Sequence, residues 1–399
     1  MVINMDKSYR TSESVTEGHP DKICDIVSDA LVDLFLGIDR DALVSVKALA
    51  TKDLICIAGE LAGYKCFDLD IETTIRDAVR DIGYDTDEYG FNADTLQIID
   101  KIDRHDINDS NKLKWKEGDL LGSRDQGIVF GYACNEKTSQ APNETIEFMP
   151  LPITLAHKLA QGLTNLRKSG TLNYLRPDGK TQVTIEYEQG IPRRAETVVI
   201  STLHSIDVSG KQLEKDLREL LIVPILGSLY DERTTIHINP TGRFIVGGPA
   251  IDTGLTGRKI IVDTYGEASR HGGGAFSGKD PTSSDRCGAY LARYIAKNVV
   301  ASELAKECEI ELAYAIGGFV PIHITVDTNN TGILSDRNLE RVIENNFDLS
   351  ITGAITTLQL RRPIYKQTAS YGHFGRPEFP WERLDKTEQL REVLKHVQR

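Results

Sequence analysis

The sequence predicts a mixed α/β (α+β) fold made of three similar α/β domains. Helical and extended hydrophobic patterns alternate along the whole chain, and a hairpin followed by a helix recurs about three times. The 399 residues, 40% of them hydrophobic, suffice for two or three domains with a sizeable core. The pattern alone does not separate an α/β from an α+β topology.

The first predicted helix follows Gly18-His19-Pro20, because apolar residues recur at a three-four spacing from Ile23 to Phe35. Residues 42–50 and 54–61 are extended runs joined by a short polar turn, which predicts a hairpin. A second amphipathic helix is predicted over residues 71–82.

The stretch from Lys101 to Arg124 is polar, lacks sustained periodicity and is long for a loop in a compact chain. We interpret it as a disordered or functional segment, such as a lid. Beyond it we expect helices at 153–166, 213–221, 284–304 and from Ser335, and strands at 182–187, from Thr197, 234–239, 244–246, 260–262, 309–315 and 322–327.

Composition narrows the class of protein. The net charge of −12 and the pI near 5.3 argue against nucleic-acid binding or adhesion to an anionic membrane. No apolar run approaches the ~18 residues that span a bilayer, and no signal core is expected at the N-terminus. The six cysteines are scattered, which is typical of buried thiols in a reducing compartment. We therefore expect a cytoplasmic protein.

The segment from Arg270 to Asp280 is the strongest candidate site. Its glycines let successive N–H groups turn toward an anion, and Lys279 adds positive charge. Residues 273–279 fit the G-x-x-x-x-G-K part of a phosphate loop, but Asp280 stands where a Walker motif needs Ser or Thr. Phosphate binding is favoured over a flexible turn, and a Walker loop is disfavoured.

Two further segments carry matching chemistry. Arg258 and Lys259, at the start of an expected strand, supply cations that a polyphosphate needs alongside Lys279. Pro20 suits the first helical position, so His19 is expected at the cap, where it can donate to a phosphate, and Asp21 in the first turn can ligate Mg²⁺. Each also has an ordinary interpretation, as solvated cations or as helix-capping residues.

Other candidates are equally explained as turn or cap residues: Asp125, Asp178 and Lys180 in a Pro-Asp-Gly turn, and Asp285 at the start of the long helix. On residue chemistry alone, the hypothesis is a magnesium-dependent enzyme acting on a nucleoside polyphosphate.

Several long motifs resemble one family, S-adenosylmethionine synthetase (methionine adenosyltransferase). They are the segments 11–22, 125–133, 238–244, 254–266, 271–280 and 371–376. The resemblance implies three domains with pseudo-threefold symmetry and shared segments: 1–107, a gating loop at 108–122, 123–247 and 248–399. It also implies a homodimer or homotetramer with active sites at the dimer interface, ATP and L-methionine as substrates, and the use of two Mg²⁺ per site.

The implied reaction is attack of the methionine sulfur on C5′ of ATP, release of triphosphate, and its hydrolysis to pyrophosphate and phosphate. The resemblance implies a role for each matching residue: His19 at the leaving oxygen; Asp21 and Asp285 as Mg²⁺ ligands; Arg258, Lys259, Lys279 and Lys180 on the phosphates; Asp178, Ala275, Arg243 and Phe244 on the nucleotide; Asp125 and Asp252 as orienting carboxylates; and Glu60, Asp103, Asp252 and Lys279 near methionine.

The chain also departs from the family pattern. Lys47 replaces a glutamate that usually holds K⁺, so we expect little dependence on K⁺. Ser283 replaces a lysine, and Arg124, which replaces a glycine, is the candidate to compensate for it. The gating loop begins Asp103-Arg104-His105, without the usual glutamine, which alters the expected methionine contact.

Two other classes of function are open alternatives. A nucleoside triphosphatase or phosphotransferase is favoured by the glycine run but opposed by Asp280. A non-catalytic nucleotide-binding regulatory subunit is suggested by Lys47 and Ser283, but the retained His19, Asp21 and Lys279 oppose it.

Overall fold

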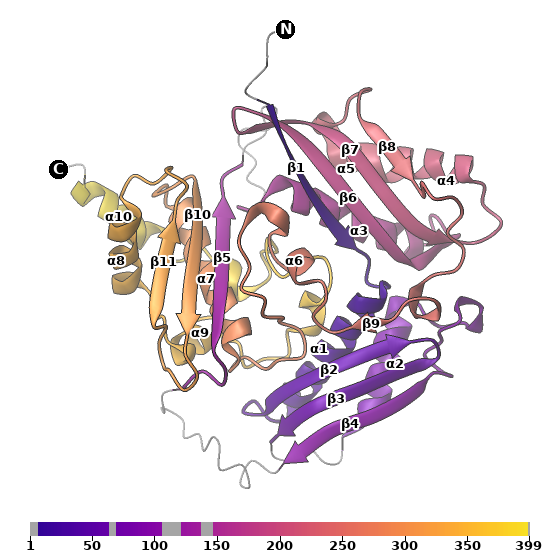
Figure 1. The fold of residues 1–399 in the computed structure, drawn as a ribbon, viewed down its shortest axis with the longest axis horizontal. Helices are drawn as coiled ribbons and strands as arrows, with labels where there is room; N and C mark the ends of the chain where they lie inside the picture. Colours follow the sequence, from indigo (N-terminus) through magenta and orange to yellow (C-terminus); the bar gives the residue numbers. More distant parts are fainter. Residues whose placement is uncertain (1–6, 64–68, 106–120, 137–146, 398–399) are drawn as a thin grey trace.

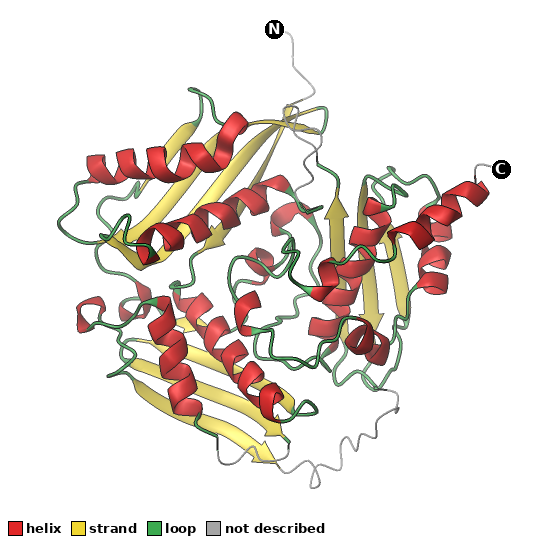
Figure 2. Ribbon diagram, turned by 180° about the vertical axis from the view of Figure 1, so that it is seen from behind, coloured by secondary structure: helices red, strands yellow, loops and turns green. Residues whose placement is uncertain are grey.

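The computed structural model describes residues 7–63, 69–105, 121–136 and 147–397, which form three β-sheets with helices packed against them (Figure 1). Seen from behind, the helices lie in front of the sheets, so one side of the molecule is helical and the other exposes sheet (Figure 2). This arrangement confirms the predicted three-part α/β fold.

The first sheet has the order β4-β3-β2-β9. The hairpin of β2 (Leu43–Thr51) and β3 (Leu54–Ala62) is antiparallel as predicted, β4 (Gln97–His105) runs parallel to β3, and β9 (Gly254–Leu255) pairs with β2. Alternate residues of β2 are buried under α1 (Pro20–Ile38), which packs on α2 (Ile71–Ile82). Gly83 closes α2 at a φ of 104°, a conformation that favours glycine.

The second sheet, β1-β6-β7-β8, joins the start of the chain to its middle. Its strands are β1 (Lys7–Val15), β6 (Leu175–Glu188), β7 (Ile191–His204) and β8 (Thr235–Ile238). The helical segments of this region are α3 (Leu151–Lys168), α4 (Gly210–Leu217), a π turn (Arg218–Ile222) and α5 (Val223–Leu226). Apolar residues of these elements form a core of their own.

The third sheet, β11-β10-β5, joins the middle of the chain to its end. Its strands are β5 (Gly127–Cys134), β10 (Glu307–Tyr314) and β11 (His323–Asp327), and the helices of this region are α7 (Ser284–Ala301), α8 (Asp336–Asn346), α9 (Ile351–Thr357) and α10 (Thr387–Val397). The buried α7 shares one continuous core with α1 and the first sheet. Short 3₁₀ turns are Asp87–Tyr89, Gly227–Leu229, Gly248–Ala250, Gly266–Ala268, Lys366–Thr368 and Pro380–Glu382.

Three sequence-based predictions of local structure were wrong. Residues 260–262 begin a helical turn, α6 (Ile260–Asp263), because tertiary contacts that anchor Lys259 override the β-branched pattern. Residues 244–246 form no strand, since in the described part of the chain a single backbone hydrogen bond, from the His204 N–H to the Phe244 carbonyl, joins this segment to β7. The Pro-Asp-Gly segment at 177–179 lies inside β6, where a register shift between Leu175 and Gly179 absorbs it as a bulge.

The polar stretch at 101–124 was also misjudged at its start, since residues up to His105 belong to β4. Residues 106–120, which hold most of the predicted gating loop, lie outside the described residues. Leu121 to Ser123 follow as irregular chain, tied by Ser123 to Gly317 and Gly318.

Candidate active site

His19 caps α1, as predicted. Its Nδ1 accepts the Asp21 N–H at 3.1 Å, and Pro20 occupies the first turn, where its missing N–H costs nothing. A nitrogen that accepts carries no proton, so the proton of a neutral ring lies on Nε2. That Nε2 is buried and has no hydrogen-bond partner within the described part of the chain. His19 therefore presents an unused N–H donor.

The charge state of His19 follows from its surroundings. Burial, together with the charges of Lys259 and Lys180, lowers the pKa of His19 to about 3. The imidazole is therefore neutral at pH 7 and can act as a hydrogen-bond donor without being a cation.

Asp21 joins α1 to the loop that carries the candidate cations. Its carboxylate accepts Lys259 Nζ at 2.6 Å and the Leu255 N–H at 3.0 Å. Burial raises the pKa of Asp21, but these hydrogen bonds, led by the one from Lys259, outweigh burial and leave the pKa below its usual value. A Cβ on Gly254 would lie 2.0 Å from the Pro20 carbonyl oxygen, so only glycine permits this approach. The neighbouring Arg258 is exposed.

Asp178 is a second unsatisfied polar group near this cluster. Its Oδ2 accepts the Gly248 N–H at 2.9 Å, whereas its buried Oδ1 has no partner in the residues that the structure describes. Burial raises the pKa of Asp178 to about 6, although the Gly248 N–H and Lys180 partly oppose this. Asp252 lies close enough to contribute to that shift.

The predicted nucleotide pair Arg243 and Phe244 follows β8. Phe244 is held by two backbone contacts to His204: its carbonyl accepts the His204 N–H at 2.9 Å, and its N–H points to His204 Nε2 at 3.4 Å. The Phe244 ring is half-buried and Arg243 is exposed. Sequence reasoning missed His204.

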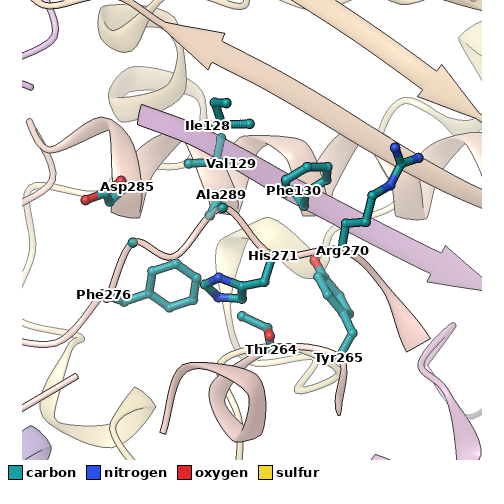
Figure 3. Close-up of a pocket in the computed structure, with 12 residues that line it drawn as sticks. Ile128, Val129, Phe130, Thr264, Tyr265, Arg270, His271, Phe276, Asp285 and Ala289 are labelled. Atoms are coloured by element: carbon teal, nitrogen blue, oxygen red, sulfur yellow. The ribbon is translucent and has the colours of Figure 1, made fainter. Parts of the chain in front are cut away.

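Lys279 and Asp285 form a second cluster. Lys279 Nζ donates to Asp285 Oδ2 at 2.6 Å. The glycine loop passes directly over this carboxylate, since a Cβ on Gly274 would lie 2.3 Å from Asp285 Oδ1. Asp285 lines a pocket together with His271 and Phe276, and all three side chains are labelled in Figure 3. Asp125 lies beside this cluster, because its carbonyl accepts the Ser284 hydroxyl at 3.5 Å.

Asp280, which excludes a Walker loop, has a structural role. It is fully buried and accepts hydrogen bonds from the Val44 N–H, the Thr282 N–H and hydroxyl, and Arg124. Arg124 pairs with this carboxylate at 2.8 Å. Ser283 is the N-cap residue of α7.

A row of residues crosses the first sheet to reach Lys279. Asp103 pairs with Glu60, Glu60 with Ser45, and Ser45 forms an isolated bridge with Lys279. Lys47 lies two residues further along β2, opposite Ala58, which is itself opposite Lys101. Two lysines therefore flank Ala58 at roughly 10 Å from each other, at about 4.8 Å per strand.

The predicted residues thus gather in two clusters. The first holds His19, Asp21, Lys259, Lys180, Asp178 and Asp252, with Arg258, Arg243 and Phe244 on adjoining segments, and the second holds Lys279, Asp285 and Asp125. Glu60 and Asp103 lie apart from both, two and three strands from Lys279 on the row that crosses the first sheet. Gly257 and Ala275 bring the two together, since a Cβ on Gly257 would lie 2.6 Å from Ala275 Cβ. Across the residues that the structure describes, no side-chain hydrogen bond joins the clusters.

The donor set suits a metal ion shared with a substrate. Within the described ranges, no group of three or more His, Cys, Asp or Glu side chains could hold a metal alone. Mg²⁺ is usually bound by one or two carboxylates together with substrate phosphates. Asp21 in the first cluster and Asp285 in the second, each paired with a lysine, fit that mode of binding.

Sequence reasoning missed the buried charges behind both clusters. Lys22 donates to Asp25 and Asp263, and Arg286 forms a bidentate pair with Asp29 at 2.7 and 2.9 Å. The sequence does contain a pattern that indicates these buried charges, because an acidic residue recurs at every fourth position in the first helix.

Comparison with family models covers most of the chain. The model described as S-adenosylmethionine synthetase, N-terminal domain, matches residues 7–106; the central domain matches 120–244; and the C-terminal domain matches 246–383. Along the described part of the chain, no helix combines the length and the apolar character needed to cross a membrane.

Proposed function

Since the chain belongs to the S-adenosylmethionine synthetase family, whose members make S-adenosylmethionine from ATP and methionine, we propose that His19 drives the departure of triphosphate. The observation that carries this proposal is the buried Nε2–H of a neutral histidine, which has no hydrogen-bond partner among the described residues and lies close to two lysines. A fixed donor aimed at developing negative charge is an effective catalytic device.

In the proposed step, the methionine sulfur donates a lone pair to C5′ of the ribose. The C5′–O bond breaks, and its electron pair leaves with the triphosphate oxygen. His19 Nε2–H donates to that oxygen, while Arg258, Lys259, Lys180 and Lys279 balance the phosphate charge. The sulfur carries no proton, so the step needs no general base. Hydrolysis of the triphosphate to pyrophosphate and phosphate follows.

Asp178, Arg243, Phe244 and Ala275 are proposed to bind the nucleotide. The unpartnered Asp178 Oδ1 supports this, because a buried acceptor needs a donor from a ligand. The half-buried ring of Phe244 suits stacking on adenine. Asp125 and Asp252 would orient the substrates.

Methionine is proposed to bind near the row that crosses the first sheet. Glu60 and Asp103 place two carboxylates side by side there, and these suit an ammonium group. Asp252 would contact both substrates, and Lys279, at the end of the row, suits the methionine carboxylate as well as phosphate.

Two Mg²⁺ ions per site are proposed, held by Asp21 and Asp285 together with phosphate oxygens. When bound, Mg²⁺ stabilises the charge of the leaving triphosphate. A K⁺ requirement is not expected, since Lys47 occupies the position of the glutamate that usually holds K⁺, and Lys101 adds positive charge two strands away in the same row.

The active unit is proposed to be a homodimer, alone or paired into a homotetramer, with active sites between subunits in the cytoplasm. Support comes from the membership of the family, since the resemblance implies active sites at a dimer interface. Apolar residues also remain exposed in the third sheet and its connecting loop, including Ile128 and Ile316.

A product assay tests the proposal. Incubation with ATP, L-methionine and Mg²⁺, followed by mass spectrometry, should give the sulfonium product, pyrophosphate and phosphate. ADP and phosphate without a sulfonium would instead indicate a triphosphatase, and no turnover with retained ATP binding would indicate a regulatory subunit.

A further inference from the structure

Four aspartates repeat every fourth residue along α1: Asp21, Asp25, Asp29 and Asp33. Their side chains lie on one face, about 6 Å apart, because an α-helix rises about 1.5 Å per residue. The first three are buried and Asp33 is half-buried. Like charges at this spacing weaken a helix, and buried carboxylates are costly unless they are hydrogen-bonded and paired. The cost of burying this column of carboxylates must therefore be offset by the interactions that the carboxylates make.

Each aspartate accepts the backbone N–H of a segment distant in the sequence. The pairs are Asp21 with Leu255 at 3.0 Å, Asp25 with Gly257 at 2.8 Å, Asp29 with Gly278 at 2.8 Å, and Asp33 with Tyr365 and Lys366 at 2.8 Å each. Hydrogen bonds from N–H groups to carboxylates are stronger than those between neutral groups. The helix thus anchors three separate loops through one face.

The two middle anchors hold the residues that directly precede the candidate cations. Gly257 comes before Arg258 and Lys259, and Gly278 comes before Lys279. Both glycines have φ of 80°, and a Cβ on Gly278 would lie 1.9 Å from the Val46 carbonyl oxygen. The backbone can meet these carboxylates only because both positions are glycine.

The spacing of the loop anchors along α1 matches the spacing of the same loops along β2. Asp21 and Asp29 are about 12 Å apart along α1. Along β2, the positions beside Leu255 and Lys279 are about 13 Å apart. The side chains of Lys22 and Arg286 neutralise Asp25 and Asp29, so the column keeps its carboxylates in a buried setting.

We propose that Asp25 and Asp29 are positioning residues, which fix the loop bearing Arg258 and Lys259 and the loop bearing Lys279 at set points on one rigid helix. The inference rests on the proposed function of those cations in binding triphosphate. Neither carboxylate touches the substrate. Their effect reaches the reaction through the two glycine N–H groups.

The test compares Asp25→Asn, Asp29→Asn and Asp33→Asn in the full-length protein. Asp33→Asn is the matched control, because it lies in the same column but anchors residues 365–366, which carry no candidate site residue. Hydrogen–deuterium exchange and steady-state kinetics are measured for each variant. Asparagine keeps the shape and an acceptor but loses the charge.

We expect Asp25→Asn to raise exchange at residues 255–259 about ten-fold without a matching rise at 276–279, and Asp29→Asn to do the reverse. In both variants kcat falls roughly ten-fold or more, while the KM for methionine changes by less than about two-fold. Asp33→Asn changes neither quantity. If Asp29→Asn does not fold because Arg286 loses its charged partner, the Asp25 arm decides.

Equal exchange at both loops in Asp25→Asn, or a loss of kcat in Asp33→Asn as large as in Asp25→Asn, would overturn the inference, because the column would then serve only the stability of the fold. Lys259→Met separates the two levels of the proposal. An unchanged rate in that variant refutes the role of the cation, whereas selective exchange in Asp25→Asn still supports the anchoring.

Discussion

His19→Asn isolates the proposed donor from the helix cap. The two ring nitrogens have separate roles: Nδ1 accepts the Asp21 N–H, and the described residues leave Nε2–H free to donate to a substrate. Asparagine is among the best N-cap residues, so α1 keeps its first hydrogen bond. The shorter amide does not extend to the place of Nε2, so the variant removes the donor alone.

The magnitude follows from the donor's setting. Nε2 is buried in a protein environment with two lysines nearby, which is where a fixed donor is worth most. Loss of one such donor costs about 10²–10³ in kcat, or about 2.7–4 kcal/mol. The change in stability is expected to be near zero, since one good cap replaces another.

The assay measures sulfonium formation at saturating ATP and methionine, together with the thermal midpoint. His19→Ala is the control: it loses the donor and the cap, so it shows the same fall in kcat and loses about 1 kcal/mol of stability. A His19→Asn enzyme within about three-fold of wild-type kcat would refute the role of His19 as donor. A wild-type rate that titrates with a pKa near 6.5 assigned to His19 would refute its neutral state.

Three further predictions concern charge. Arg286→Met leaves Asp29 buried without its bidentate partner, so the free energy of unfolding should fall by about 3–5 kcal/mol in urea titrations; a fall below about 1 kcal/mol contradicts the pairing. Burial lowers the pKa of His157 to about 3, so the unfolded chain binds more protons than the folded chain between pH 6.5 and 3. The free energy of unfolding therefore decreases as the pH is lowered through that range. When the pH falls from 7.5 to 5.5, the His157→Gln variant should therefore lose about 1.3 kcal/mol less stability than the wild type. Asp33 and Asp178, whose raised pKa values have the opposite effect, are present in both proteins and cancel in this comparison. Equal losses of stability in the two proteins contradict the prediction. Wild-type activity should not change when KCl replaces a bulky organic cation salt, whereas Lys47→Glu should gain a K⁺ response; a several-fold rise in the wild type contradicts the proposed replacement.

Local patterns predicted most of the fold. The spacing of Ile71 to Ile82 and the closing Gly83 gave α2, and the two extended runs around residues 51–53 gave the hairpin. The failures lie where long-range contacts overrule propensity. Residues 260–262 are rich in β-branched side chains but form a helical turn, because Lys259 is bound to Asp21. Asp21 and Lys259 are 238 residues apart in the chain, so local spacing cannot predict that they are in contact.

The candidate site was predictable by residue type but not by arrangement. The cap at His19 could be predicted from Pro20 alone, and the glycine loop from its composition. The unpartnered Asp178 Oδ1 could not, since it depends on a strand bulge where the sequence predicted a turn. The same holds for the anchors on α1, because the partners of Asp25 and Asp29 are backbone N–H groups more than 200 residues away in the chain.

The pairing of each proposed metal ligand with a lysine predicts an order of binding for Mg²⁺ and nucleotide. Asp21 is bonded to Lys259 and Asp285 to Lys279, both at 2.6 Å, so each carboxylate already has a positive partner. A Mg²⁺ ion arriving alone must compete with these ammonium groups, whereas Mg²⁺ carried by a polyphosphate supplies an anion for each displaced lysine. Asp21 and Asp285 then keep a positive partner, and the displaced lysines gain a negative one. The proposed site is therefore built to bind the metal with the nucleotide, and Mg²⁺ titrated calorimetrically without nucleotide should bind far more weakly than in its presence.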